Sequence, residues 1–396
     1  LAVSPDKKTA FVANVGVYEY PLIEGITPQN YDSMLIPYQP YGDNTKESLE
    51  GMVIDGKKIP GLGSPLVPEA MSVFTIDLAT NTVIDKFKTG HQIGQMIEDA
   101  EVVGGASPNS IAVGKDFAYV TNATNDNISI IDYKKREIVG HIPITVDQRI
   151  DKYRGLLPFG ITLSKDEKTL YTALLGYNAV AVIDVESRST RGVIPAGWGP
   201  TRVLLSSDEK EMYVISCRGL GAGPNGGSTY QAPVQGTYVG DVQLASFQKI
   251  PVPDATQLAS YTKQSNDNTF REVTVKDNKT NPLPPLPVAG QSPIKYVVFI
   301  TKENRTYDEV MGQVKTGKGD PTLARYGLGV RIMTKTDTLD NVDVMPNHHK
   351  ASREFAFSDN FYCDSDASVH GHHWMVGVIP NEWVEANASV SKTAKV

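Results

Sequence analysis

The chain has 396 residues, of which 40% are hydrophobic and 21% charged. At about 100–200 residues per domain, this length predicts two or three domains, or one large repeat domain with a smaller partner. The 38 basic and 45 acidic residues give a formal net charge of −7, which provides no electrostatic basis for binding nucleic acid or an anionic membrane. Apolar runs such as Val297–Ile300 are far shorter than the ~20 residues of a membrane-spanning helix, and two cysteines exclude a disulfide scaffold.

The first two thirds of the chain repeat one pattern of strand, charged turn and strand. The four copies share a polar turn between two apolar runs and begin at Leu1, Ile111, Ile161 and Val203. A second pair of runs belongs to three of the copies, and its first run ends on Ile-Asp, at Asp77, Asp132 and Asp184. Because apolar and polar residues alternate within these runs, they indicate half-buried β-strands.

Four short antiparallel strands per repeat of about 40–50 residues are typical of a β-propeller blade. Within the second copy, Tyr119–Asn122 resembles the YVTN-type propeller repeat of many bacterial exported proteins. We therefore predict a mainly β fold in which residues 1–275 form a partial propeller with four visible blades. One antiparallel sheet should contain Ile111–Val113, Tyr119–Asn122, Ile128–Asp132 and Glu137–Ile142. Since Leu1 lies within a strand-turn unit, we expect further blades before it.

Two long insertions interrupt the repeats, residues 16–70 in the first blade and residues 219–228 in the fourth. Each is interpreted as a surface loop; the alternative is a rim that binds a ligand or a protein partner, because propellers place function in such loops. The second insertion is rich in glycine but lacks the Gly-Lys-Ser/Thr ending of a phosphate-binding loop. Nucleotide binding is therefore not predicted there.

Residues 276–293 hold five of the 25 prolines and predict a stiff linker, followed by a second domain over residues 294–396. The apolar run Lys295–Thr301 predicts a buried strand of a parallel sheet, and the polar segment Glu303–Asp308 follows it directly. The carboxyl end of such a strand is where α/β enzymes place their active sites. The linker therefore predicts a change from β repeats to an α/β domain.

Five of the seven histidines lie between residues 348 and 373. Residues 347–357 have helical spacing, with an expected apolar face of Ala351, Phe355 and Ala356. Ser368 stands at a predicted strand-to-helix turn, where helix N-terminal amides can hold a phosphate. A serine hydroxyl is nevertheless a poor nucleophile unless a base or a metal ion activates it.

The segments on both sides of these histidines carry a family resemblance. Four segments resemble the phosphoesterase branch of the alkaline phosphatase superfamily, which includes phospholipase C-like and acid-phosphatase-like enzymes. These segments are Ile300–Gln313, Pro346–His349, Phe357–Asp364 and Ser368–Trp374. More closely, the chain resembles bacterial two-domain proteins that fuse a YVTN-type propeller to such a domain. The resemblance implies metal-dependent hydrolysis of a phosphate ester, an α/β alkaline-phosphatase-like domain that starts after the linker, and a periplasmic or cell-surface location.

The resemblance also implies roles for individual residues. In the superfamily an acidic residue after the first strand ligates a metal ion, and this position matches Glu303 and Asn304. Ser368 matches the serine that attacks phosphorus, and Ser365 is its nearest rival. The implied cofactors are divalent metal ions, namely zinc, manganese or calcium, which would activate the serine before a phosphoserine intermediate is hydrolysed.

His372, His349 and Arg305 are the candidate substrate-binding residues. Each has a structural alternative, because the histidines could be partly buried helix residues and Arg305 could form an ion pair. Glu303 and Asn304 could likewise form an ordinary turn, and Ser368 could only cap a helix.

The metal centre implied by the resemblance is incomplete in this chain. Relatives use a second set of Asp and His ligands, whereas no Asp follows Asp366 and no His follows His373. We therefore expect the parent protein to continue beyond Val396 and this chain by itself to be inactive. The alternative function is a non-catalytic propeller that binds a partner or acts as a scaffold, with a degenerate or incomplete phosphatase domain.

Overall fold

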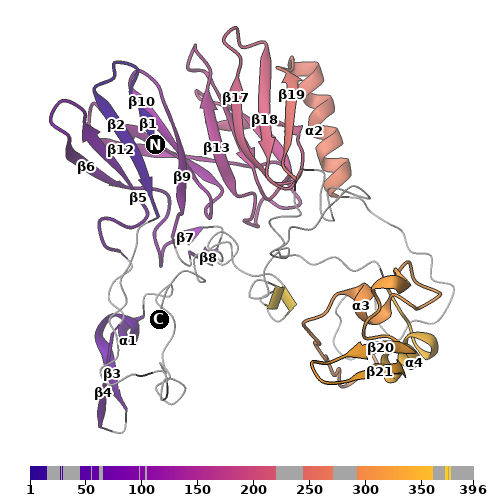
Figure 1. Cartoon of the computed structure of the whole chain (residues 1–396). Helices are drawn as coiled ribbons and strands as arrows, with labels where there is room; N and C mark the ends of the chain where they lie inside the picture. The colour runs from indigo at the N-terminus through magenta and orange to yellow at the C-terminus, as the bar shows by residue number, and fades with distance from the viewer. Residues whose placement is uncertain are drawn as a thin grey trace. The chain divides into compact units, whose positions relative to one another are not determined.

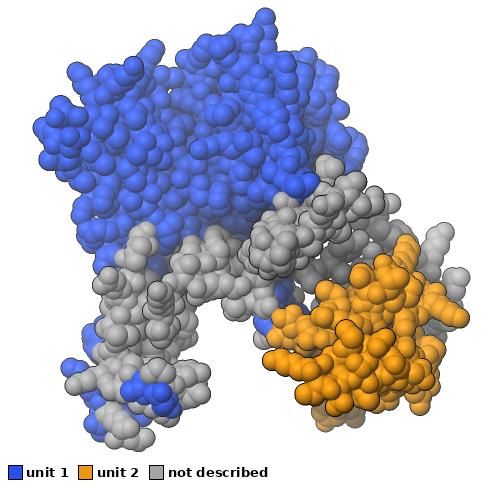
Figure 2. Space-filling view, viewed as in Figure 1, with its two compact units in different colours: residues 1–272, 365–396 blue, residues 273–364 orange. Residues whose placement is uncertain are grey.

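The structure is a computed structural model, and it describes residues 1–15, 27, 29, 45–54, 56–61, 66–97, 99–102, 105–219, 244–270, 292–359, 371–372 and 374–375. The chain divides into two compact units, residues 1–272 together with 365–396, and residues 273–364 (Figure 2). The predicted boundaries at 276 and 293 remain predictions, because residues 271–291 lie outside the described part of the chain.

The first unit contains four successive antiparallel sheets (Figure 1). The first sheet has the strands β1 (Ala2–Val3), β2 (Thr9–Asn14), β5 (Ser72–Asp77) and β6 (Thr82–Lys88). The second has β9 (Pro108–Val113), β10 (Phe117–Asn122), β11 (Asn127–Asp132) and β12 (Glu137–Pro143). The third has β13 (Pro158–Leu163), β14 (Thr169–Leu174), β15 (Ala179–Asp184) and β16 (Ser189–Pro195). The fourth has β17 (Pro200–Leu205), β18 (Glu211–Ser216) and β19 (Ser246–Pro251).

The predicted repeat is therefore confirmed as a series of blade-like sheets. The four strands predicted for the second blade pair in one antiparallel sheet, as expected. In the first blade, β2 and β5 pair from Thr9 opposite Asp77 to Asn14 opposite Ser72, although residues 16–70 separate them in the sequence. The first insertion thus interrupts the chain but not the sheet.

Local turn chemistry explains why the polar positions repeat. In three of the charged turns a serine hydroxyl donates to the aspartate two residues later, at 2.6, 2.6 and 2.7 Å, in the pairs Ser4 and Asp6, Ser164 and Asp166, and Ser206 and Asp208. The Ile-Asp aspartates act in the second turn of each blade, where their carboxylates accept backbone N–H groups two or three residues later; they are Asp77, Asp132 and Asp184. Such bonds replace the backbone partners that a turn lacks.

The hydrophobic core lies between successive sheets. Phe11 and Ile131 belong to a buried cluster between the first two sheets, and Leu170 and Ile128 to a cluster between the second and third. A further cluster around Met212 joins the third sheet to the fourth. The first strands of the blades are also neighbours, since β9 contacts β1 and β13, and β13 contacts β17. Face-to-face sheets with adjacent first strands are the arrangement of propeller blades.

The last part of this unit differs from the prediction of strands up to residue 275. The helix α2 (Ala255–Thr269) follows β19 and packs on β16. Asp254 caps it by accepting the backbone N–H of Gln257 at 2.8 Å, and Leu258 is buried against the third sheet. An N-cap aspartate and one buried helical face thus favour a helix here over a fourth strand.

Smaller elements lie in the first insertion and between the first and second blades. The helix α1 (Lys46–Glu50) and the hairpin of β3 (Gly51–Ile54) and β4 (Lys57–Pro60) belong to the first insertion, and β7 (Met96–Ile97) pairs with β8 (Ala100–Glu101) before the second blade. The second insertion lies, apart from Gly219, outside the described residues. Among the helices that the structure describes, none has the length and apolar character needed to cross a membrane.

The second unit contains α3 (Tyr307–Met311), the 3₁₀-helix η5 (Pro321–Leu323), the antiparallel pair β20 (Val330–Met333) and β21 (Thr338–Val342), and α4 (Pro346–Glu354). An alkaline-phosphatase-like domain is not shown, since the described residues of this unit hold no parallel sheet. The strand predicted over Lys295–Thr301 is wrong here, because these residues form no strand and Tyr296–Ile300 are 71–89% exposed. An apolar run becomes a buried strand only where neighbouring strands and a covering layer exist.

The predicted helix over residues 347–357 is confirmed as α4, but its predicted apolar face is wrong. Phe355 is 72% exposed and Ala351 is also exposed, whereas His349 and Ser352 are buried. The Nε2 atom of His349 lies 2.8 Å from the carbonyl oxygen of Val310, so that a hydrogen bond joins α4 to α3. This polar contact decides which side of the helix faces inward.

Candidate functional site

The structure places the predicted metal ligands, Glu303 and Asn304, on an exposed irregular segment before α3. The following residues begin the helix: Thr306 is the N-cap, and Glu309 accepts its backbone N–H at 2.9 Å in a capping box. Glu309 also forms an ion pair with Arg325. Much of the Glu-Asn-Arg-Thr-Tyr-Asp segment therefore has a local structural role, since a capping box satisfies amides that the helix start leaves unpaired.

The candidate substrate residue Arg305 lies over the ring of Tyr326, with its guanidinium carbon 4.8 Å from the ring centre. Its Nη1 atom donates to the carbonyl oxygen of Asn304 at 3.2 Å. Because the residue is exposed, this cation–π contact is weak. The guanidinium can therefore turn toward a ligand at small cost.

Tyr307 is the most unusual group of this segment. Its ring stacks on Phe357 with centres 6.2 Å apart, and its hydroxyl is buried without a hydrogen-bond partner. Burial, together with the carboxylates of Asp359 and Asp308, raises the pKa of this phenol. Asp308 accepts the backbone N–H of Asp320 at 2.7 Å, so its carboxylate fastens the loop that follows α3.

The candidate histidines have different surroundings. His349 is 3% exposed and its Nε2 atom is taken by the Val310 carbonyl, which leaves no free ring nitrogen on that side for a substrate. His348 lies beside Lys302, with 2.9 Å between Nε2 and Nζ, and burial and that cation lower its pKa. His372 is partly buried in a short helical stretch assigned to the first unit. Ser368 and its rival Ser365 lie outside the described residues.

Because Ser368 and Ser365 lie outside the described residues, the structure does not test the predicted site as a whole, and the roles assigned to these residues remain predictions. Within the described ranges there is no group of three or more His, Cys, Asp or Glu side chains placed to hold a metal ion. Glu303 and Asn304 supply a carboxylate and an amide oxygen, which zinc, manganese and calcium accept, but two such groups do not complete a metal centre.

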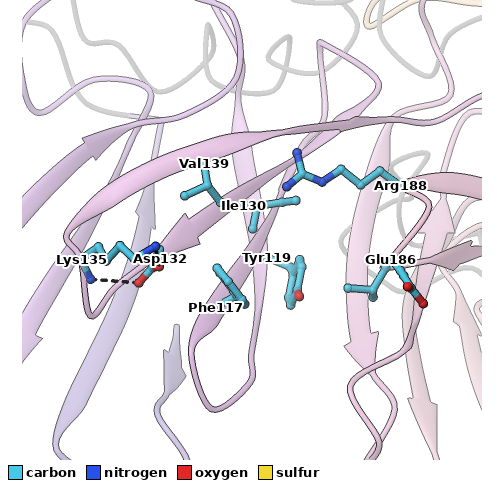
Figure 3. A pocket seen from close by; sticks show the side chains of 9 residues that line it. Phe117, Tyr119, Ile130, Asp132, Lys135, Val139, Glu186 and Arg188 are labelled. Carbon is cyan, nitrogen blue, oxygen red and sulfur yellow. Dashed lines mark hydrogen bonds and ion pairs between the residues drawn. The ribbon is translucent and has the colours of Figure 1, made fainter.

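A surface pocket of about 330 Å³ lies between the second and third sheets (Figure 3). Figure 3 shows Arg188 extended across it above Tyr119, with Lys135 paired to Asp132 at 3.4 Å. Burial raises the pKa of the Tyr119 phenol, which therefore stays neutral. Two cationic and two acidic side chains line the pocket, Glu186 being the second acid. This mixture favours no single sign of ligand charge.

A second polar cluster involves His91 and His141, which belong to none of the predicted site segments. His91 follows β6 in the first blade and His141 lies on β12 in the second, with ring centres 5.3 Å apart. The Nδ1 atom of His91 lies 3.3 Å from Asn127 Nδ2, and that of His141 lies 3.0 Å from Ser129 Oγ. Burial lowers the pKa of both rings, helped by Arg154 at His91 and by His91 at His141. Both shifts favour the neutral form of each ring.

A sequence signal for this cluster exists, although it is short. Each histidine follows a glycine at or just after the last strand of its blade, as Gly90-His91 and Gly140-His141. Both glycines have positive φ, 60° and 144°, a conformation that other residues rarely adopt. A Gly-His pair at similar places in two consecutive repeats could have marked the site.

Comparison with known proteins assigns neither a family nor an activity. No protein-family model matches the chain, and no curated protein matches it. Among solved structures, Kuenenia stuttgartiensis hydrazine synthase matches at 23% identity over 47% of this chain and 44% of that chain, with a TM-score of 0.30. Virginiamycin B lyase from Staphylococcus aureus matches at 15% over 36% and 41%, with a TM-score of 0.27. A streptogramin B lyase matches at 15% over 47% and 50%, with a TM-score of 0.30.

The chain thus spans half or less of the length of each of these solved structures. With TM-scores of 0.27–0.30, the similarities carry no argument about activity or binding. The assignment of propeller-type blades rests instead on the order, pairing and packing of the four sheets.

Proposed function

We propose that the protein is a metal-dependent phosphoesterase in which Ser368 is the nucleophile and the propeller-type unit is a scaffold or binding domain. The observation that carries the proposal is the combination of Glu303–Asp308 with Ser368–Trp374 in one chain that begins with blade-like repeats. The four packed sheets support the scaffold part. The exposure of Glu303 and Asn304 supports the catalytic part, because ligating oxygens must be accessible.

In the proposed reaction, the Ser368 hydroxyl attacks phosphorus in line with the ester oxygen. A bond forms between Oγ and phosphorus while the bond to the ester oxygen breaks, and the serine proton passes to solvent as the leaving alcohol takes one up. Water then attacks the phosphoserine and releases phosphate and the free serine. Within the described residues, no group of side chains completes a metal centre. His372 and Arg305 are proposed to contact the substrate.

The experiment uses the protein expressed from its complete reading frame and purified from the periplasmic and membrane fractions of a bacterial host, which also tests the proposed location. Hydrolysis of p-nitrophenyl phosphate and bis(p-nitrophenyl) phosphate is measured with zinc, manganese or calcium. We expect metal-stimulated turnover that Ser368→Ala lowers by at least about a hundredfold, with Glu303→Gln also impaired.

Ser365→Ala is the matched control, because it removes the same hydroxyl three positions away. Loss of turnover in Ser365→Ala but not in Ser368→Ala would transfer the nucleophile to Ser365. Metal-stimulated turnover that neither substitution changes would contradict the serine mechanism. A folded protein without turnover on either ester would favour the second candidate, a non-catalytic propeller scaffold, which the packed sheets by themselves support.

A further inference from the structure

A polar network connects His91 and His141 to buried side chains of the second blade. Asn122 and Ser129 are both 0% exposed, and Asn127 is 4% exposed. Asn122 Nδ2 donates to Asn127 Oδ1 and to Ser129 Oγ, in both cases at 2.8 Å. Buried groups of this kind have few alternative partners. Their hydrogen bonds therefore determine which nitrogen of each histidine ring carries the proton.

The Ser129 hydroxyl determines the proton position on His141. Its oxygen accepts two hydrogen bonds, from Asn122 Nδ2 and from the backbone N–H of Gly90 at 2.9 Å. A hydroxyl has two acceptor positions and one proton, so its proton is directed to the remaining neighbour, His141 Nδ1 at 3.0 Å. The neutral His141 ring therefore carries its proton on Nε2.

The same reasoning applies to His91. Asn127 uses its Oδ1 atom to accept from Asn122, so the amide nitrogen, 3.3 Å from His91 Nδ1, is the donor. His91 Nδ1 accepts, and its proton also lies on Nε2. The opposite orientation of the two amides would leave the N–H groups of buried Asn122 unpaired, whereas the observed one leaves only its Oδ1 atom unpaired. Unpaired buried N–H groups are rarer than under-satisfied carbonyl oxygens.

Two neutral rings that carry their protons on Nε2 suit an acceptor ligand rather than a metal ion. A metal-bound histidine offers an unprotonated nitrogen and donates its other N–H to the protein, which is the reverse of this arrangement. The nearby cation is Arg154, whose charge lowers the pKa of His91. The carboxylate of Asp126, the residue before Asn127, accepts the backbone N–H groups of Gly155, Leu156 and Leu157. The site thus presents N–H donors with a cation nearby.

We propose that His91 and His141 form an oxyanion-binding site between the first and second blades, in which each neutral imidazole donates its Nε2–H to a ligand oxygen. The ligand class is a phosphate or carboxylate group, whose several oxygens can accept from two donors at once. Hydrogen bonds from Asn127 and Ser129 to the Nδ1 atoms hold the half-buried rings in place. Because the rings are already ordered, binding a ligand costs less conformational entropy.

The first test is the protonation state of the rings. In the full protein labelled with [¹⁵N]histidine, long-range ¹H–¹⁵N spectra distinguish Nε2–H from Nδ1–H rings, and His91→Gln and His141→Gln assign the two signals. We expect both rings to be Nε2–H at pH 8. Nδ1–H rings at these positions would overturn the proposal, because they would show that the amide network has the opposite orientation.

The second test is binding, with inorganic phosphate and acetate as separate probes. EDTA is present and the protein carries Ser368→Ala, so that the result does not depend on the proposed phosphoesterase activity. We expect the His91 and His141 signals to shift together and saturably with at least one probe, and the effective probe identifies the ligand group. His91→Leu or His141→Leu should weaken binding roughly tenfold or more, which is the usual effect of losing one hydrogen bond to a charged group.

His141→Gln is the matched variant, since its amide N–H lies near the lost Nε2–H; binding within about threefold of wild type would support the donor role. His348→Leu, in the other unit, should leave the His91 and His141 shifts unchanged, and thermal melts confirm that each variant is folded. Failure of both probes to shift either ring at tens of millimolar would overturn the proposal. So would shifts produced by zinc, without EDTA, but by neither anion.

Discussion

Asp126 provides the most demanding test of how the blades are joined. It lies in the turn between β10 and β11 with φ of 47°, and it is 7% exposed. Its carboxylate accepts the backbone N–H groups of Gly155, Leu156 and Leu157 at 2.7, 2.9 and 3.0 Å. These three residues lead into β13, so one side chain of the second blade holds the entrance to the third. We predict that Asp126→Ala destabilises the first unit strongly.

The size of the effect follows from the three donors. A hydrogen bond to a charged group contributes about 1.5–3 kcal/mol, and a buried donor that loses its partner keeps the full desolvation penalty. Leu156 and Leu157 are 7% and 8% exposed, so their N–H groups cannot turn to water, whereas that of the exposed Gly155 can. Two uncompensated losses correspond to a decrease of about 3–6 kcal/mol in the free energy of unfolding.

Asn178 is the matched control, because it occupies the corresponding turn of the third blade with φ of 56°, and its side chain accepts a single N–H group among the described residues, that of Gly199 at 2.8 Å. Asn178→Ala should therefore cost about 1 kcal/mol. Urea unfolding measures both variants, and hydrogen exchange reports on the amides of residues 155–157. The reasoning would be refuted if Asp126→Ala were no more destabilising than Asn178→Ala, or if those amides kept their protection.

Two further predictions concern packing and acid stability. Leu170→Ala should lower the free energy of unfolding by about 2–5 kcal/mol, because Leu170 is 0% exposed between the second and third sheets. Leu204→Ala is the control and should cost less than about 1 kcal/mol, because that side chain is 53% exposed. Equal urea midpoints for the two variants would contradict this core assignment. The hydrogen bond from Arg149 lowers the pKa of Asp147 from 3.8 to about 2, so the folded-state pKa lies below the unfolded one. The stabilisation from Asp147 is then present above pH 3.8 and lost as the pH falls toward 2. Asp147→Asn should therefore reduce the difference in urea midpoint between pH 5 and pH 2. An unchanged difference would show that the titration of Asp147 does not contribute to stability.

The strands of the first unit could be predicted because their signals are local. Alternating apolar residues specify which side of a strand is buried, and serine and aspartate side chains close each turn through bonds two or three residues away, as in Ser164 to Asp166. The same repeat predicted that β2 and β5 belong to one blade across a long insertion. None of these features needs a distant part of the chain to define it.

Two segments show where this reasoning fails. The apolar run Lys295–Thr301 has the composition of a buried strand, yet it forms no strand, because an apolar run is buried only where other strands and a covering layer are present. Residues 255–269 were expected to continue the strands. They form a capped helix instead, and its Leu258 packs against the third sheet. The composition of a segment favours one type of secondary structure, and the elements that it packs against determine which type forms.

The sequence by itself determined the repeated strands and the polar turns, because each depends on neighbours within a few residues. Tertiary structure alone decided which polar groups meet. His91 and His141 come from different blades, and their ring centres lie 5.3 Å apart only because the first and second sheets pack face to face around Phe11 and Ile131. The protons on those rings depend in turn on Asn122, Asn127 and Ser129, whose burial removes the water that would otherwise satisfy them.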